Sequence, residues 1–329
     1  MATLSVLNPT LLDLAKLRDP DGNVAQIVEI LNQNNGILDD VTFKEGNEPM
    51  GHRSTIRTGI PAPTWRKMYG YVAPNKGTTA QVVDNCGMLM ARSQIDVKEA
   101  DFNGNEAAWR MSEDAAHLEG MAQEFAESLF YANEATAPEE FTGFAPRYNS
   151  LSAASGANIV DAFSGSGGDL TSIYLVVWGP QSIFCFSPKG GAAGLKMEDK
   201  GIQTISDANG GRLDVYETVY SQDVGLCVRD WRQGGRVANI DISDNATPAT
   251  AKGILNHMIA LEERVHNLSA GRAAWYCSRT MMTYLRQGVL SAVSNQLTYE
   301  TVAGKRFLAF DGIPVRRVDK ISHTETRVV

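Results

Sequence analysis

The stretch that decides the fold is EAAWRMSEDAAHLEGMAQEFAESLFYA, residues 106–132. Its apolar residues recur at alternating spacings of four and three, which places them on one side of a 3.6-residue helix. At a rise of roughly 1.5 Å per residue, this helix would span about 40 Å. The sequence therefore predicts a long spine helix that packs through an apolar stripe of Met111, Ala115, Leu118, Ala122, Phe125 and Leu129.

The opposite face of the spine helix is acidic. Arg110 lies four residues after Glu106 and four before Asp114, a spacing at which opposite charges meet on a helix surface. Three roles fit this face: it is solvated, it meets the Arg316–Arg317 region, or it meets a loop of a neighbouring chain. Its acidic residues are Glu106, Glu113, Asp114, Glu119, Glu124 and Glu127.

On the N-terminal side of the spine, residues 43–90 are rich in Pro, Gly, Thr and Asn and have no helical period. Thr55–Arg57 and Met68–Val72 are typical of short extended segments, and Gly59–Pro61 and Pro74–Gly77 suit turns. A segment of this length with little core of its own is usually a functional loop or a disordered one. The pattern predicts a long hairpin that projects from the body.

The aromatic residues of this hairpin argue against simple disorder. Trp65, Tyr69 and Tyr71 are either packed on the same chain or reserved for a partner, since exposed rings of this kind usually have one. Under the second interpretation they contact another chain, together with the basic residues Arg57 and Arg66.

Ahead of the hairpin, the first 35 residues contain two short helical patterns, at 11–14 and 24–31, separated by Pro and Gly. Neither pattern is large enough to stand alone. They form either the opening of a core or an arm laid on a neighbouring chain.

Beyond the spine, the sequence predicts strands and helices that together make an α+β fold. Gly190–Gly201 is loop-like, and a helix that starts at Thr247–Pro248 is expected to end before Gly271. A strand pair at 306–319 turns around Asp311 and Gly312. The other expected strands are Ile173–Trp178, Ser182–Phe186, Arg212–Val219, Val224–Asp230, Val237–Ile242 and Ala273–Cys277.

Composition excludes several classes of protein. A net charge of −8 argues against a broad basic surface for nucleic acid, although local contacts stay open. No run of about 18 apolar residues could span a membrane, and the N-terminus does not have the pattern of a signal peptide. Four widely spaced cysteines fit buried free thiols better than a zinc site or a redox motif.

The sequence offers no cofactor motif, metal motif or catalytic motif. The five histidines stand singly, and acidic pairs such as Asp241/Asp244 and Glu262/Glu263 are usually solvated. The glycine-rich stretch Ser164–Asp169 has an aspartate where a phosphate loop has its lysine. No enzyme is therefore expected, and a soluble hydrolase with a Ser/His/Asp set from distant positions is kept as a remote alternative.

The order of these pieces carries a resemblance. An N-terminal arm, a long hairpin, a spine helix, a mixed region and a closing strand pair resemble the major capsid proteins of tailed bacteriophages, whose coat fold is shared with the herpesvirus capsid floor. The phrase Phe310–Val315 and the turn Phe141–Phe144 after the spine are similar to what such coat proteins carry there.

The resemblance implies four parts and no catalytic function. Residues 1–40 would be an N-terminal arm, 41–95 an extended loop over a neighbour, 96–150 plus 271–329 a peripheral domain with the spine helix, and 151–270 an axial domain. The chain would form hexamers and pentamers of an icosahedral head around double-stranded DNA. Trp65, Tyr69, Tyr71, Arg57 and Arg66 would then be inter-subunit contacts.

The resemblance also implies partners. These are further copies of the chain, a separate scaffolding protein, a portal, a cement or decoration protein, and packaged DNA on the inner face, with no membrane. The protein would reside in the virion capsid after assembly in the host cytoplasm. The alternative within the same fold is an encapsulin-like compartment that encloses a cargo protein.

Overall fold

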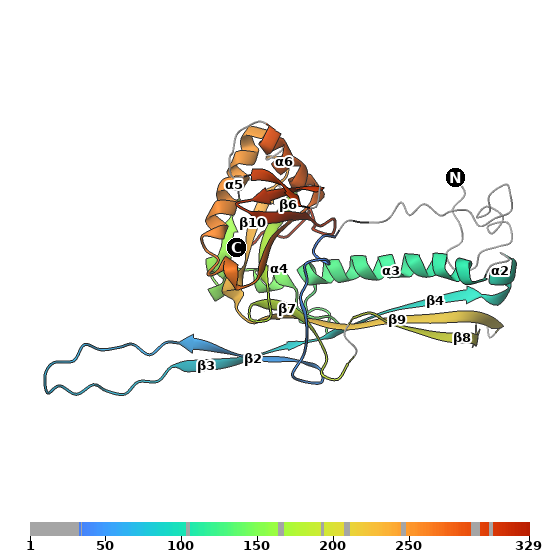
Figure 1. Ribbon diagram of the computed structural model, residues 1–329, viewed down its shortest axis with the longest axis horizontal. Coiled ribbons are helices and arrows are strands. Elements are labelled where there is room, and N and C mark those ends of the chain that lie inside the picture. Colours follow the sequence, from blue (N-terminus) through green and yellow to red (C-terminus); the bar gives the residue numbers. More distant parts are fainter. Residues whose placement is uncertain are drawn as a thin grey trace. The chain divides into compact units, whose positions relative to one another are not determined.

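A computed structural model of the chain, shown in Figure 1, contains the predicted spine as helix α3 (Glu106–Tyr131). The chain divides into two units. The first includes Leu89–Glu124 and Leu195–Gln222, and the second is made of Asn34–Met88, Phe125–Gly194 and Asp223–Val329. The structure describes residues 33, 35–102, 106–163, 168–191, 194–206, 211–244, 248–290, 297–302 and 305–329. The helical patterns expected at 11–14 and 24–31 lie outside these residues.

In the first unit, α3 packs on neighbouring strands (Figure 1). β8 pairs antiparallel with β9, and β4 is the other neighbour of β9 in the sheet. Ile95, Ala100 and Trp109 form a buried cluster against Tyr216. The elements of this unit are β4 (Gly87–Asp96), α2 (Val97–Phe102), β8 (Lys196–Ser206), β9 (Arg212–Val228) and the beginning of α3.

Arg110 joins the spine helix to β8. Its guanidinium lies 3.6 Å from Glu106 on the same helix, as the sequence spacing predicts, and 2.9 Å from Asp199 on β8. It also lies over the ring of Tyr216, 4.9 Å from the centroid. Although partial burial lowers the pKa of Arg110, the hydrogen bond and charge of Asp199 raise it above its ordinary value.

The predicted apolar stripe is right for the second half of α3 and wrong for the first half. Phe125 and Leu129 are buried, whereas Met111 is 75% exposed. The first half instead buries Trp109 and Asp114. Polar contacts with β9 orient this part of the helix: burial and then the charge and hydrogen bond of Asp114 raise the pKa of Tyr220 to about 12. Ala115 and Leu118 are also exposed.

Two predictions about strands are wrong in this region. The segment expected to be a loop, Gly190–Gly201, ends inside β8, where Gly201 takes a φ of 68° at a register shift. The two strands expected between Arg212 and Asp230 are one 17-residue strand, β9. β8 has exposed residues on both faces, so the alternation that marks a half-buried strand is missing from its sequence.

The second unit contains a large part of the sheet. From one edge the strand order is β12, β13, β14, β11, β6, β7 and β9, with β10 paired to β6 and β5, and β1 paired to β7. Every residue of β6 is buried, as expected of a continuous apolar strand covered on both faces. The strands are β1 (Phe43–Glu45), β5 (Ile159–Asp161), β6 (Leu170–Trp178), β7 (Ile183–Ser187), β10 (Gly234–Asp241), β11 (Arg272–Cys277), β12 (Leu297–Val302), β13 (Lys305–Phe310) and β14 (Ile313–Arg317).

Helices α5 (Pro248–Glu262) and α6 (Arg279–Leu290) cover one face of this sheet (Figure 1). Their apolar side chains join those of β6, β10, β11 and β14 in one buried cluster. The prediction that the first of these helices continues toward Gly271 is wrong, because α5 ends at Glu262. The short helix η3 (Leu268–Ala270) follows, and η1 (Ala154–Asn158) and η2 (Trp231–Gln233) are similar short turns.

The other face of the sheet receives the end of α3. Phe130 is fully buried, and its ring centroid lies 5.0 Å from that of Tyr174 on β6 and 6.4 Å from that of Tyr276 on β11. Phe144, the first residue of α4 (Phe144–Arg147), lies 5.9 Å from Phe130. This aromatic cluster fixes the end of the spine helix to the sheet.

The closing turn has the predicted geometry. Asp311 and Gly312 connect β13 to β14 with φ values of 48° and 78°. Two consecutive positive φ angles are those of a type I′ turn, for which an Asp-Gly pair is well suited. The strand β12, which pairs with β13, was not predicted.

The predicted hairpin is present as β2 (Gly51–Gly59) and β3 (Thr78–Asn85), an antiparallel two-stranded sheet. The extended segment expected at Met68–Val72 is wrong, since this part contains a turn in which the amide of Gly70 donates to the carbonyl of Lys67 at 2.9 Å. Figure 1 shows the connecting loop, residues 60–77, extending beyond the ends of both strands.

Candidate functional site

The hairpin of β2, β3 and their connecting loop contains the predicted contact residues, and the side chains of all of them are exposed. Trp65, Tyr69 and Tyr71 are 104%, 96% and 85% exposed. Arg57, on β2, and Arg66, in the loop, are exposed as well. The rings therefore do not pack on the described residues of their own chain.

The apolar exposure of this loop continues through neighbouring side chains. Ile60 is 86% exposed and Met68 is 87% exposed. A two-stranded hairpin is at best marginally stable in water without packing partners. Large exposed rings of this kind are typical of interaction surfaces in general.

The hairpin is also basic, a signal that the net charge of the chain conceals. Between Glu48 and Asp84 the sequence contains five basic residues and no acidic one, in a chain of net charge −8. The five are Arg53, Arg57, Arg66, Lys67 and Lys76. Counting charge by segment would have found this basic stretch, whose Arg66 and Lys67 lie between the aromatic residues Trp65 and Tyr69.

The root of the hairpin, in contrast, is fixed to other segments of the second unit. Arg147 of α4 donates to Asp84 of β3 at 2.8 Å and to the carbonyl of Leu226 on β9 at 3.0 Å. Ser54 of β2 lies 3.5 Å from the thiol of Cys227 on β9. The base of the loop is thus anchored by hydrogen bonds, while its tip has no partner in the described part of the chain.

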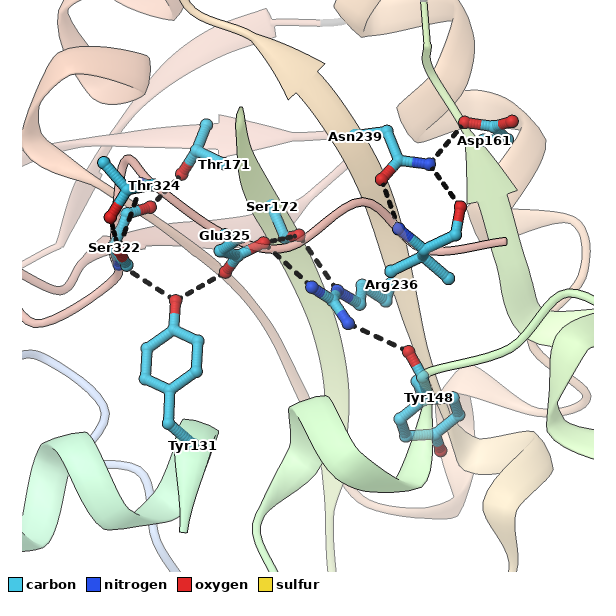
Figure 2. Close-up of polar contacts among 11 residues, drawn as sticks. Tyr131, Tyr148, Asp161, Thr171, Ser172, Arg236, Asn239, Ser322, Thr324 and Glu325 are labelled. Atoms are coloured by element: carbon cyan, nitrogen blue, oxygen red, sulfur yellow. Dashed lines mark hydrogen bonds and ion pairs between the residues drawn. The ribbon is translucent and has the colours of Figure 1, made fainter. Parts of the chain in front are cut away.

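A second polar site holds the C-terminal segment, and Figure 2 shows its contacts. Arg236 of β10 donates to Glu325 at 2.8 Å, to Ser172 at 2.9 Å and to the carbonyl of Tyr148 at 2.9 Å. Ser172 also donates to Glu325. Tyr131, at the end of α3, donates to the other carboxylate oxygen of Glu325 at 2.5 Å.

The surroundings of this site keep Tyr131 protonated and Arg236 charged. Burial and then the nearby Tyr174 and Glu325 raise the pKa of Tyr131 well above its ordinary value, so it stays a donor. Burial lowers the pKa of Arg236, but Tyr174 and Glu325 raise it by more, so the guanidinium stays charged. A buried carboxylate thus has three donors, as burial of a charge requires.

Asn239 holds the end of the same segment. Its side chain accepts from the amide of Val328 at 2.8 Å and donates to the carbonyl of Val328 at 2.9 Å. It also donates to Asp161 at 2.8 Å. Asn239 has a φ of 61°, a left-handed conformation that asparagine tolerates better than most residues. Sequence reasoning did not identify this anchor, because its residues are far apart along the chain.

Asp40 forms a third buried polar centre. Its side chain is 0% exposed and lies 2.6 Å from Arg272 and 3.2 Å from Arg316. The hydroxyl of Tyr276 donates to it at 3.0 Å and accepts from Trp178 at 2.7 Å. Asp40 therefore attaches the segment that precedes β1 to β11 and β14.

No chemistry of catalysis emerges from these groups. Among the described residues, no cluster of three or more His, Cys, Asp or Glu side chains could hold a metal ion. The described part of the chain also has no helix that is long and apolar enough to cross a membrane. Most of the glycine-rich stretch rejected as a phosphate loop, residues 164–167, lies outside the described residues.

The cysteines match the expectation of free thiols. Cys185, Cys227 and Cys277 are buried and Cys86 is half-buried, all without disulfides. Burial raises the pKa of the Cys227 and Cys277 thiols to about 12. Such thiols are structural rather than reactive.

Comparisons with known proteins assign these features to one family. A family model described as major capsid protein GP7 matches residues 19–329. A chain in the solved structure of bacteriophage Epsilon15 is 31% identical, with a TM-score of 0.74 over 100% of this chain and 99% of that chain. A comparison with curated proteins found no match.

More distant structures show the fold alone. A chain of the bacteriophage JBD30 capsid is 9% identical, with a TM-score of 0.52 over 96% of this chain and 99% of that one. A weaker likeness, to a chain of an encapsulin complex from Synechococcus elongatus PCC 7942, is 10% identical with a TM-score of 0.43 over 71% of this chain and 97% of that one. The family match over residues 19–329 and the full-length likeness to the Epsilon15 chain show that the protein belongs to the major capsid protein GP7 family of bacteriophages and has the fold of tailed-phage capsid proteins.

Proposed function

We propose that this major capsid protein assembles into hexamers and pentamers, which close into the icosahedral head that encloses double-stranded DNA. Membership of the family makes the chain a structural protein of the virion capsid and not an enzyme. The observation that carries the finer proposal is the loop at 60–77, whose aromatic side chains are exposed on a basic hairpin. Heterologous contacts of this kind repeat from subunit to subunit until symmetry closes the shell.

The partner of this loop is proposed to be a second copy of the chain. The spine helix offers carboxylates of opposite charge, because Glu106 and Glu124 lie on the same side of it and are half-exposed and exposed. Complementary charge steers the encounter and fixes the register, while the buried rings supply most of the affinity. Trp65, Tyr69 and Tyr71 would be the anchors, and Arg57 and Arg66 would meet the acidic helix.

The proposed division into parts follows the fold resemblance. Residues 1–40 form the arm, 41–95 the extended loop, 96–150 with 271–329 the peripheral domain, and 151–270 the axial domain. One feature supports a shift of the last boundary: β11 and β14 lie in the same sheet as β6 and share its buried cluster. We therefore propose that residues 272–317 belong with the axial part.

Assembly is proposed to need further partners. A scaffolding protein would guide closure, a portal would occupy one vertex, and a cement or decoration protein would bind the outer surface. Packaged DNA would face the inner surface, and assembly would take place in the host cytoplasm. The acidic net charge of −8 supports weak rather than tight contact with that DNA.

Electron microscopy of the chain produced with its scaffolding protein tests the proposal. The expected particles are closed icosahedral shells. A matched variant replaces Ile60–Gly77 by Asn-Gly, which keeps β2 and β3 with a two-residue turn. We expect that variant to fold and to stay unassembled. Persistent monomers of the unaltered chain would contradict the proposal, and shells that enclose a cargo protein and no DNA would favour an encapsulin-like role instead.

A further inference from the structure

His52 occupies an unusual place at the root of the hairpin. It is the second residue of β2 and only 8% exposed. Its ring lies 5.3 Å from that of Phe184, edge to face, and 5.7 Å from that of Phe186, both on β7. Its Nδ1 atom is buried and has no hydrogen-bond partner among the described residues. The apolar cage therefore holds an imidazole with an unused polar atom.

The residue opposite His52 on β3 is a carboxylate with an unused acceptor. His52 pairs directly with Asp84 in the hairpin register, so both side chains are on the same face of the two-stranded sheet. Arg147 binds Oδ1 of Asp84 at 2.8 Å. The other oxygen, Oδ2, is buried and has no hydrogen-bond partner in the described part of the chain. The root thus contains a potential donor and a carboxylate on facing positions, with the thiol of Cys227 also near Asp84.

From this geometry we propose that His52 is a proton-sensitive hinge that releases the root of the hairpin from β7 and β9 when it becomes charged. In the closed root the imidazole is neutral and packs between two phenylalanine rings. A charged imidazolium there is poorly solvated unless it reaches Asp84, whose carboxylate Arg147 already holds. A charged His52 is stabilised only by turning from Phe184 and Phe186 toward the carboxylate of Asp84, so charging breaks the aromatic packing that holds β2 to β7.

The charged groups around His52 oppose protonation on balance. Burial lowers the pKa of His52 below its ordinary value, and the cations Lys44 of β1 and Arg229, just past β9, add to this effect. Asp84 and Glu48 act in the other direction. Arg53 forms an ion pair with Glu48 at 2.6 Å. The amine of Lys44 lies 5.5 Å from the ring centroid of Phe184.

The direction of the pH effect follows from linkage. Because the imidazole is harder to protonate in the closed root than in water, the opened root binds the proton more tightly. Opening therefore becomes easier as the pH falls below about 6.5, by up to about tenfold per pH unit. Above that pH the hinge is closed, and the hairpin keeps the angle at which the loop can meet a neighbouring subunit. This last consequence rests on the proposed function, whereas the opening itself does not.

Hydrogen exchange of the full-length chain tests the hinge. Protection of the amides in 51–54 and 82–85 is measured between pH 7.5 and 5.5, with the intrinsic pH dependence of exchange removed. We expect protection to fall by up to about tenfold per pH unit below pH 6.5. In His52→Phe, which keeps the aromatic packing but cannot be charged, protection should not depend on pH. His266→Gln, at an exposed histidine, is the control and should behave as the unaltered chain.

Two results would overturn the hinge. One is an unchanged protection of the unaltered chain across this pH range, and the other is an equal pH dependence in His52→Phe. His52→Gln, also uncharged, gives the same answer if the phenylalanine variant does not fold. A parallel light-scattering measurement on assembled shells separates the two proposals: shells that never form contradict the proposed function, while the exchange result stands on its own.

Discussion

Arg236 donates a hydrogen bond to Glu325 over 2.8 Å, and the two side chains are only 4% and 5% exposed. This buried ion pair joins β10 to the C-terminal segment, and water reaches neither of its two charged groups to any large extent. A buried pair contributes little compared with a well-packed apolar pair, but the loss of one partner leaves an unpaired buried charge. The consequence can be measured.

Arg236→Met should lower the free energy of unfolding by about 3–5 kcal/mol, because it leaves the Glu325 carboxylate buried without its cation. The double variant Arg236→Met/Glu325→Gln should recover part of this loss. Lys320→Ala is the matched control, since its ion pair with Glu127 is more exposed and should contribute less than about 1 kcal/mol. Urea unfolding followed by tryptophan fluorescence measures all three. Equal losses in Arg236→Met and Lys320→Ala would contradict the account of this site.

The spine helix makes an equally direct prediction. Phe130→Ala should lower the free energy of unfolding by about 3–5 kcal/mol, because Phe130 is fully buried among Phe144, Tyr174 and Tyr276. Met111→Ala should change it by no more than about 0.5 kcal/mol, because Met111 is 75% exposed. The same urea experiment decides. A large loss of unfolding free energy in Met111→Ala would instead support the apolar stripe that the sequence predicted for the first half of the helix.

Glu262 predicts a pH dependence. Burial, followed by the charge and hydrogen bond of Asp311, raises its pKa from 4.5 to about 7. A carboxyl whose pKa is raised on folding stabilises the protein at low pH and loses that contribution as the pH rises through the folded value. Between pH 5 and 8, the urea midpoint should therefore fall less in Glu262→Gln than in the unaltered chain. Glu139→Gln, at an exposed carboxyl, should leave the slope unchanged. If the urea midpoint fell equally with pH in Glu262→Gln and in the unaltered chain, the raised pKa of Glu262 would be contradicted.

Limited digestion with trypsin reports on the loop. Arg66 and Lys67 are exposed at its tip, a place where proteases cut readily. Free subunits should be cut there first, and assembled shells should be cut at least about tenfold more slowly, because the loop would be covered. Arg66→Gln/Lys67→Gln should remove this cleavage in the free subunit. Equal cleavage rates in shells and free subunits would show that assembly does not cover the loop.

Much of the architecture could be predicted because it depends on local patterns. The hairpin was visible from its glycines, prolines and aromatics, and the type I′ turn from the adjacent Asp311 and Gly312. The buried strand β6 was visible as a continuous apolar run. In each case a short stretch contains all the information that its structure needs.

The wrong or missing predictions share one physical cause: the sequence around a residue does not show which distant residue it will contact. The first half of the spine helix buries Trp109 and Asp114, because β9 offers polar groups there. β8 is held by pairing with β9 and has no apolar face to reveal it. The pair Arg236–Glu325 joins positions 89 residues apart, so no spacing rule could indicate it.

The assignment of the hairpin residues as inter-subunit contacts is a proposal, and the structure shows only that their side chains are exposed. Trp65, Tyr69 and Tyr71 were chosen because rings in a glycine- and proline-rich hairpin need something to pack on. In the described part of the chain, the rings of these three residues are exposed to solvent. The basic charge of the same hairpin indicates what kind of surface would cover them.

A cryo-electron microscopy reconstruction of the assembled particle tests the central claim most directly, because it shows what the loop at 60–77 touches. The account predicts icosahedral symmetry, with density for Trp65, Tyr69 and Tyr71 packed against the acidic spine helix of a neighbouring subunit. A particle in which these three side chains contact only their own chain, or stay in solvent, would contradict it.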